Sequence, residues 1–266
     1  MSILIIQLPA RQRSSASAPE AAPATPGPQS YAYVLSADGE ALSRQGRCEL
    51  AQMPPADSVV AVLAPTDVSW HRLTLPKAPQ ARLRAALASL LEEVLLDEPE
   101  QLHLAVAPQA KVGQPTWVAV CDHTWLTSQL MAMEKAQLRV DRVVPGAAPD
   151  EPATVLFHEA LEAGQSSWES GHEVLVTWAG PDGVSTWPLG GSLSRGLLPD
   201  PLPPQARFLA TPPVASPAER WLGRAVTVQT PAEHMLLASR SLWNLLQFEL
   251  AAEAFVRHLL ALRRPA

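Results

Sequence analysis

Side chains able to perform acid–base or metal chemistry are spread along this chain without a catalytic pattern. Its seven histidines lie far apart in the sequence. His158 and Glu159 begin like the HExxH motif of zinc proteases, but Glu162 stands where the second histidine ligand is required. No GxSxG nucleophile elbow, GxxxxGK[ST] phosphate loop or GxGxxG dinucleotide loop occurs. We therefore expect neither catalytic residues nor a metal or cofactor site.

A group of acidic residues is more informative, and we call it the acidic cluster. It comprises Glu92, Glu93, Asp97, Glu98 and Glu100. These residues follow the apolar face of a predicted helix, where carboxylates oppose the helix dipole by about 0.3–1 kcal/mol each. Helix propensity therefore does not explain them. Two interpretations remain open, a solvated surface and a docking surface for a basic partner element.

Composition limits the classes of function. The chain has 266 residues, of which 47% are hydrophobic and 17% charged, and its net charge is −6. These values indicate a globular protein and argue against nucleic acid as the main partner, because backbone phosphates require a basic face. The two cysteines, Cys48 and Cys121, lie in unrelated contexts and are expected to be free thiols in a reducing compartment. The apolar runs are too short for a signal peptide or a membrane span.

Hydrophobic periodicity divides the chain at Pro145–Pro152. Before that point we expect a first strand, a flexible Pro/Ala/Ser-rich insertion at 10–30, and a hairpin whose turn is Ala37–Glu40. An amphipathic helix should begin after Pro79 and end before Pro99, and Asp122 should cap a helix that runs to about Gln137. The other strands of this half are expected at 59–63, 68–75, 102–107, 116–121 and 138–144.

The second half repeats this organisation, with strands first and then helices and strands in alternation. Strands are expected at 153–158, 173–178, 184–188, 207–210 and 225–229, with helices at 216–222 and from Pro231 onward. Two halves of this kind indicate an α/β protein with mixed sheets.

Several stretches resemble the cytoplasmic domain of type II secretion system protein L (GspL). They read VVAVLAPTDVSWHRLTLP, then ARLRAALASLLEEVLLDEPEQLHLAV, then WVAVCDHTWL with VDRVVP, and finally SLWNLLQFELA. The resemblance implies an actin-like (ASKHA, RNase H-like) fold of two related halves, 1–145 and 146–248, followed by a juxtamembrane helix at 249–266. It also implies a non-enzymatic scaffold at the cytoplasmic face of the bacterial inner membrane, joined to a span that follows this chain.

The partners implied by this resemblance are the N-terminal domain of the type II secretion ATPase (protein E), protein M of the same system and a second copy of the chain. From the residues, a partner would be bound either at an exposed strand edge or at the acidic cluster. Two alternatives stay open: the actin-like platform protein of a type IV pilus system, and an actin-like or sugar-kinase-like phosphotransferase.

An actin-like fold raises the question of ATP. Such ATPases place an acidic residue and glycine in two phosphate-binding turns. Here the first strand runs into Gln7-Leu8-Pro9, where proline lacks the N–H that a phosphate needs. We take residues 174–187 as the second hairpin, with Thr177 and Trp178 where the acidic residue would stand. The sequence therefore predicts no ATP hydrolysis and no bound cofactor.

The end of the chain predicts a helical seam. Phe248, Ala252, Phe255, Leu259 and Leu262 are spaced three and four residues apart, so they could pair with another helix. Packing against the same domain is the alternative, and it is favoured for residues 241–247. If a span follows, as the resemblance implies, Arg257, Arg263 and Arg264 would be juxtamembrane cations on the cytoplasmic side.

Overall fold

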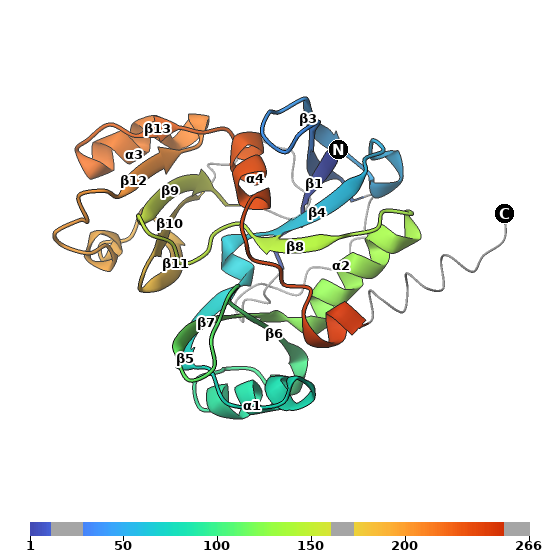
Figure 1. Cartoon of the computed structure of the whole chain (residues 1–266). Coiled ribbons are helices and arrows are strands. Elements are labelled where there is room, and N and C mark those ends of the chain that lie inside the picture. Colours follow the sequence, from blue (N-terminus) through green and yellow to red (C-terminus); the bar gives the residue numbers. More distant parts are fainter. Residues whose placement is uncertain (12–28, 161–172, 253–266) are drawn as a thin grey trace, which may run out of the picture.

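The computed structural model describes residues 1–11, 29–160 and 173–252 (Figure 1). Within these residues, thirteen strands form three sheets, and four α-helices pack against them. The predicted seam residues Phe255, Leu259 and Leu262, the position Glu162 and most of the predicted insertion at 10–30 lie outside the described residues.

The first sheet has the order β3-β2-β1-β4-β8. β1 pairs antiparallel with β2 and parallel with β4, so a hairpin and a crossover start from the same strand. Gly39 adopts a left-handed backbone (φ +78°) in the predicted turn before β3. The strands are β1 (Ile3–Gln7), β2 (Tyr31–Ser36), β3 (Arg44–Cys48), β4 (Ser58–Leu63) and β8 (Arg142–Pro145).

The second sheet repeats this arrangement with the order β11-β10-β9-β12-β13. β9 pairs antiparallel with β10 and parallel with β12, as β1 does with β2 and β4. The two halves therefore share one topology, in which β9 is the counterpart of β1. The strands are β9 (Thr154–Glu159), β10 (Val174–Gly180), β11 (Gly183–Pro188), β12 (Arg207–Ala210) and β13 (Thr227–Val228).

A third, antiparallel sheet has the order β5-β7-β6 and carries α1 (Gln80–Leu91). Its strands are β5 (Ser69–Thr74), β6 (Leu102–Val106) and β7 (Pro115–Asp122). Leu87 and Leu91 of α1 are buried against the sheet. Figure 1 shows this unit below the first sheet.

The remaining helices are α2 (His123–Lys135), α3 (Ala215–Leu222) and α4 (Pro231–Ser239). Two of them begin where the sequence predicts, because local caps satisfy their first N–H groups. Asp122 accepts a hydrogen bond from Trp125 N at 2.6 Å. Thr230 and Glu233 form a capping box around Pro231 at the start of α4. α1 is shorter than predicted, because its helix ends at Leu91 and the carboxylates follow in a turn.

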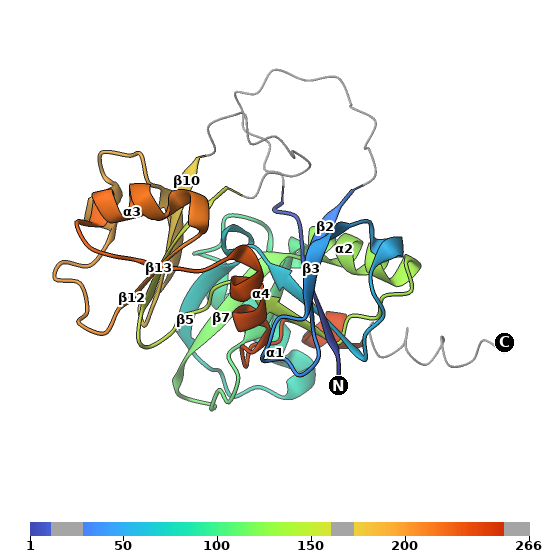
Figure 2. The ribbon, with the colours of Figure 1, turned by 90° about the horizontal axis from the view of Figure 1, so that it is seen from above.

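α4 follows the second half in sequence but packs on the first sheet (Figures 1 and 2). Met235 and Leu236 join a core cluster with Ile5, Val60 and Val144. α2 contributes to the cluster on the other side of that sheet, where Leu126 and Met133 are fully buried. The first sheet therefore lies between two helices that are far apart in the sequence.

Residues Ser241–Gln247 pack against their own domain, as the sequence analysis favours, with Trp243 and Leu245 buried in the core, and they form no helix. We call this extended segment the C-terminal strap. Leu245 N donates to Val143 O of β8 at 2.7 Å, and Asn244 Oδ1 accepts from Val143 N at 3.2 Å. At the other end Gln247 accepts from Val106 N and donates to Val106 O of β6, both at 3.0 Å. The strap therefore closes the edges of two sheets.

Candidate functional site

All five members of the acidic cluster are exposed. Glu92 and Glu93 follow α1 directly, Asp97 and Glu98 lie in the next bend, and Glu100 belongs to a short 3-10 helix, Pro99–Gln101. None of them makes an ion pair with another described residue. The structure thus places five carboxylates in one solvent-exposed loop without internal partners.

Three large apolar side chains lie among these carboxylates. Leu90, Val94 and Leu96 are 55%, 58% and 102% exposed, respectively. Isolated apolar side chains are common on protein surfaces, but here three exposed ones fall within seven residues and are interspersed in sequence with the carboxylates. We call residues 90–100 the docking segment. Leu90 and Val94 share the apolar spacing of the helix expected between Pro79 and Pro99, which predicts that they are buried, and the structure shows that they are exposed. Leu96 lies outside that spacing, so its exposure agrees with the sequence pattern.

The docking segment is held in place from beneath. Two of its own residues point inward: Leu91 is buried in the apolar cluster next to the third sheet, and the partly buried Leu95 packs on the same cluster. Its main chain closes two turns, with Val94 N donating to Leu91 O and Gln101 N donating to Glu98 O, both at 2.9 Å. Arg84 of α1 donates to Pro99 O at 3.3 Å and to Leu102 O at 3.2 Å. These contacts hold the segment against the domain.

The buried histidines serve packing and hydrogen bonding. His158 Nε2 lies 2.8 Å from Thr177 Oγ1, which lies 2.9 Å from Thr186 Oγ1. Burial lowers the pKa of His158, so the neutral ring takes part in this chain of contacts. Among the described residues, no three His, Cys, Asp or Glu side chains converge as metal ligands. Cys48 and Cys121 are free thiols, and burial raises the pKa of Cys121 to about 12.

The structure corrects the position of the second of the two turns that could hold phosphate. Gln7 donates its side-chain amide to Leu8 O and Val62 O, so it folds back onto the sheet. In the topology of the second half, the β9–β10 connection corresponds to the turn after β1. The hairpin predicted from the sequence, β10–β11, is therefore the wrong one. Thr177 instead lies in the middle of β10 and is 1% exposed. The second turn begins at Glu159 and Ala160, and residues 161–172 are outside the described part.

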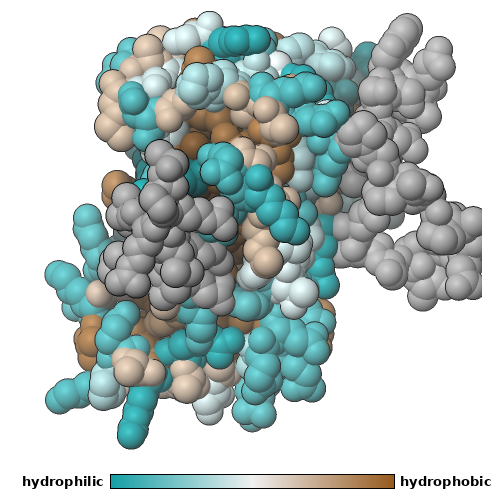
Figure 3. All heavy atoms as spheres, turned by 90° about the vertical axis from the view of Figure 1, so that its right-hand side faces the viewer, coloured by the Kyte–Doolittle hydropathy of each residue, from teal (hydrophilic) through white to brown (hydrophobic). Residues whose placement is uncertain are grey.

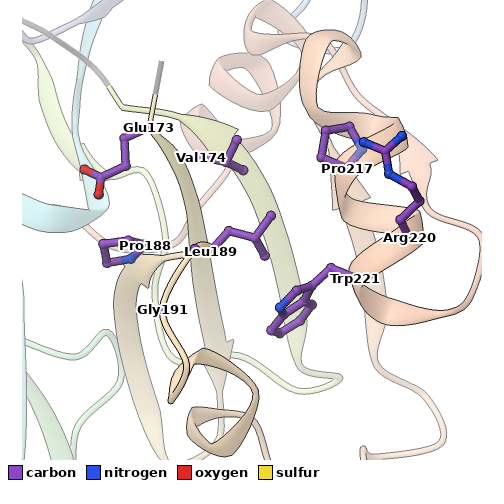
Figure 4. A pocket seen from close by; sticks show the side chains of 9 residues that line it. Glu173, Val174, Pro188, Leu189, Gly191, Pro217, Arg220 and Trp221 are labelled. Carbon is purple, nitrogen blue, oxygen red and sulfur yellow. The ribbon is translucent and has the colours of Figure 1, made fainter. Parts of the chain in front are cut away.

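A shallow groove of about 840 Å³ lies between α3 and the ends of β10 and β11. Trp221 of α3 points toward Leu189 across it (Figure 4), and Arg220 is also among the lining residues. Arg195 stacks 5.5 Å from the centre of the Trp221 ring. The groove pairs no nucleophile with a general base, so its lining does not indicate catalysis.

A smaller groove of about 350 Å³ lies between α2 and the 3-10 helix Leu50–Gln52. Tyr31, Ala132 and Lys135 are among its lining residues. Figure 3 shows the face of the molecule that is on the right in Figure 1, with an apolar area near its centre and hydrophilic side chains around it. This groove also lacks a nucleophile next to a base.

The predicted seam is described at two positions only. Phe248 begins a helical turn at 248–252 and is partly buried against the cluster beneath α1, while Ala252 is exposed. Phe248 therefore contacts its own domain, and dimer formation through the seam stays a prediction. No helix among the described residues is long and apolar enough to cross a membrane.

Residues 30–157 match the family described as type II secretion system (T2SS), protein L. The type II secretion system protein L of Pectobacterium carotovorum subsp. carotovorum is 33% identical over 121 residues, which are 43% of this chain and 28% of that protein. The aligned part of the chain thus spans little more than a quarter of the length of this curated relative.

Two solved structures share the fold. The cytoplasmic domain of EpsL, an inner membrane component of the type II secretion system of Vibrio cholerae, matches with a TM-score of 0.61 and 16% identity, over 94% of this chain and 100% of that one. The PilM-PilN type IV pilus biogenesis complex matches with a TM-score of 0.51 and 14% identity, over 89% of this chain and 96% of that one. The predicted actin-like fold with mixed sheets is confirmed.

Proposed function

Because residues 30–157 match the type II secretion system protein L family, we propose that the chain is a non-enzymatic platform component that docks the secretion ATPase to the membrane complex. The contact would be made by the docking segment and the N-terminal domain of the ATPase. The observation that carries this proposal is the exposed docking segment, in which three exposed apolar side chains are interspersed in sequence with five exposed carboxylates that form no ion pair within the described part of the chain.

The chemistry of the docking segment specifies the partner. Apolar side chains in the centre of an interface supply most of the affinity, and surrounding charges supply specificity and speed of association. A fitting partner element therefore presents an apolar stripe with Lys or Arg beside it. The chain has an overall charge of −6, which favours approach of such a basic element.

The family also supports three further proposals about the whole protein. The domain would stand at the cytoplasmic face of the inner membrane, connected to a span beyond this chain. It would associate with protein M of the same system and with a second copy of itself. The match to the pilus complex shows only a shared fold at 14% identity, so the family match to protein L decides between the two secretion-type alternatives.

The test is binding to the N-terminal domain of the cognate secretion ATPase, measured by titration calorimetry. We expect the double substitution Glu92→Lys with Glu93→Lys to weaken binding about tenfold or more, because attraction becomes repulsion at the rim. Leu96→Ser should weaken binding without changing its salt dependence. Raising salt to about 0.5 M should weaken wild-type binding by screening.

The matched control is Glu151→Lys with Asp182→Lys, which changes net charge equally at two exposed positions away from the docking segment. This control should bind like the wild type. Equal affinity of the wild type and the Glu92/Glu93 variant would remove the docking segment from the proposal. Absence of any binding by the wild type would overturn the docking function itself.

A further inference from the structure

Arg84 connects the docking segment to the helical turn that starts at Phe248. Its Nη2 donates to Pro99 O and Leu102 O, which flank the end of the docking segment. Its Nε lies 3.0 Å from Glu249 Oε2 in that helical turn. The Arg84 and Glu249 side chains are 23% and 48% exposed, so the guanidinium is partly shielded from solvent. One side chain therefore holds two segments that are about 150 residues apart in the sequence.

The aromatic ring of Phe248 provides a second, independent connection. It packs on the apolar cluster that contains Leu87, Leu91 and Leu102. Leu91 immediately precedes the acidic residues of the docking segment, and Leu102 follows its end. A shift of the docking segment that displaced Leu91 or Leu102 would therefore change the packing of Phe248 as well.

Phe248 has an unfavourable backbone conformation at the start of the helical turn. Its φ is +51°, in the left-handed region that a bulky residue rarely adopts. Such a conformation persists only where surrounding contacts over-determine it. Here the contacts are Gln247 on Val106, Phe248 in its cluster and Glu249 on Arg84, and the fully buried Leu250 anchors the same turn in the main core. Loss of the Arg84–Glu249 ion pair should therefore loosen the helical turn without releasing it.

We propose that Arg84 couples the docking segment to the orientation of the helical turn at 248–252. Occupation of the docking segment fixes Arg84, which favours the ion pair with Glu249 and holds the helical turn in place. An occupied docking segment favours one orientation of this helical turn by a certain factor. By linkage, that orientation raises the affinity of the docking segment for its partner by the same factor. The role of this coupling rests on the proposed docking function, whereas its existence is a property of the free chain.

Hydrogen–deuterium exchange of the full chain tests the coupling without a partner. We expect Glu249→Gln to raise exchange of the protected amides at 92–102 about two- to fivefold, the range for an exposed ion pair. Exchange at 248–252 should rise as well. Arg84→Gln should have the same effect at both places, and Arg82→Gln, an exposed position on the same helix, should leave both unchanged.

Unchanged exchange at 92–102 in Glu249→Gln would overturn the coupling, and so would an effect of Arg84→Gln on only one of the two segments. Glu249 is half-exposed, so its variant keeps the test valid if Arg84→Gln fails to fold. With the ATPase N-terminal domain bound, exchange at 248–252 should slow in the wild type and not in Glu249→Gln. If that domain does not bind, the docking function fails while the free-chain result still decides the coupling.

Discussion

Lowering the pH should destabilise the domain through His103 on β6. The ring is 1% exposed, and its Nε2 lies 2.6 Å from Leu245 O of the C-terminal strap. The carbonyl must accept, so Nε2 carries the proton, and Nδ1 is buried without a partner. Burial, which outweighs the hydrogen bond to Leu245, lowers the pKa of His103 from 6.5 to about 4. His123 and Arg84 also lower it, and Glu249 raises it.

The sign and size of the effect follow from linkage. A lowered folded-state pKa means that the unfolded chain binds the proton more tightly, so stability increases with pH. The contribution of His103 is intact above about pH 6.5 and is lost as the pH falls toward about 4. Between pH 7 and pH 5 the free energy of unfolding should therefore fall by about 2 kcal/mol on account of His103 alone.

Urea unfolding at a series of pH values, followed by tryptophan fluorescence, measures this loss. His103→Gln removes the titration and keeps an N–H donor for Leu245 O. The variant should lose about 2 kcal/mol less than the wild type between pH 7 and pH 5. His234, whose pKa burial also lowers to about 4, is present in both chains and cancels from the comparison. Equal losses in the variant and the wild type would refute the argument.

Two further predictions concern the strap and the nucleotide. Gln247→Ala removes both hydrogen bonds to Val106 and should lower the free energy of unfolding by about 1–3 kcal/mol, measured by urea unfolding. The exposed Gln52→Ala should stay within about 0.5 kcal/mol of the wild type, and a similar value for Gln247→Ala would contradict the proposed role of the strap. ATP with magnesium should show no micromolar binding in calorimetry, because Pro9 provides no N–H in the first turn and Gln7 is bonded to the sheet. Such binding would argue for the phosphotransferase alternative.

Elements with strong local signals could be predicted from the sequence. The turn at Asp38-Gly39, the cap at Asp122 and the start of α4 at Pro231 all depend on residues within four positions of each other. Their hydrogen bonds join neighbouring residues, so their positions can be predicted without knowledge of the tertiary structure. The acidic cluster could likewise be located, although its exposure could be established only from the structure.

Features that depend on distant partners could not be predicted. The apolar spacing of Leu245 and Phe248 is compatible with a helix, but hydrogen bonds to Val143 and Val106 hold residues 241–247 extended. The choice of the wrong second hairpin has a similar cause, because two consecutive hairpins, β9–β10 and β10–β11, share the strand β10. Only the parallel pairing of β9 with β12 shows which hairpin corresponds to the first half.

The C-terminal strap also determines where an autonomously soluble unit can end. A shortened chain that stopped after α4, at Ser239, would keep every helix described above and would lose the covering of β8 and β6. The N–H and C=O groups of Val143 and Val106 would then lie on open edges, which recruit strands from other molecules. Such a fragment should self-associate and precipitate, whereas one that continues through Gln247 should stay dispersed. We therefore expect residues 244–247, which read NLLQ, to protect the domain against aggregation.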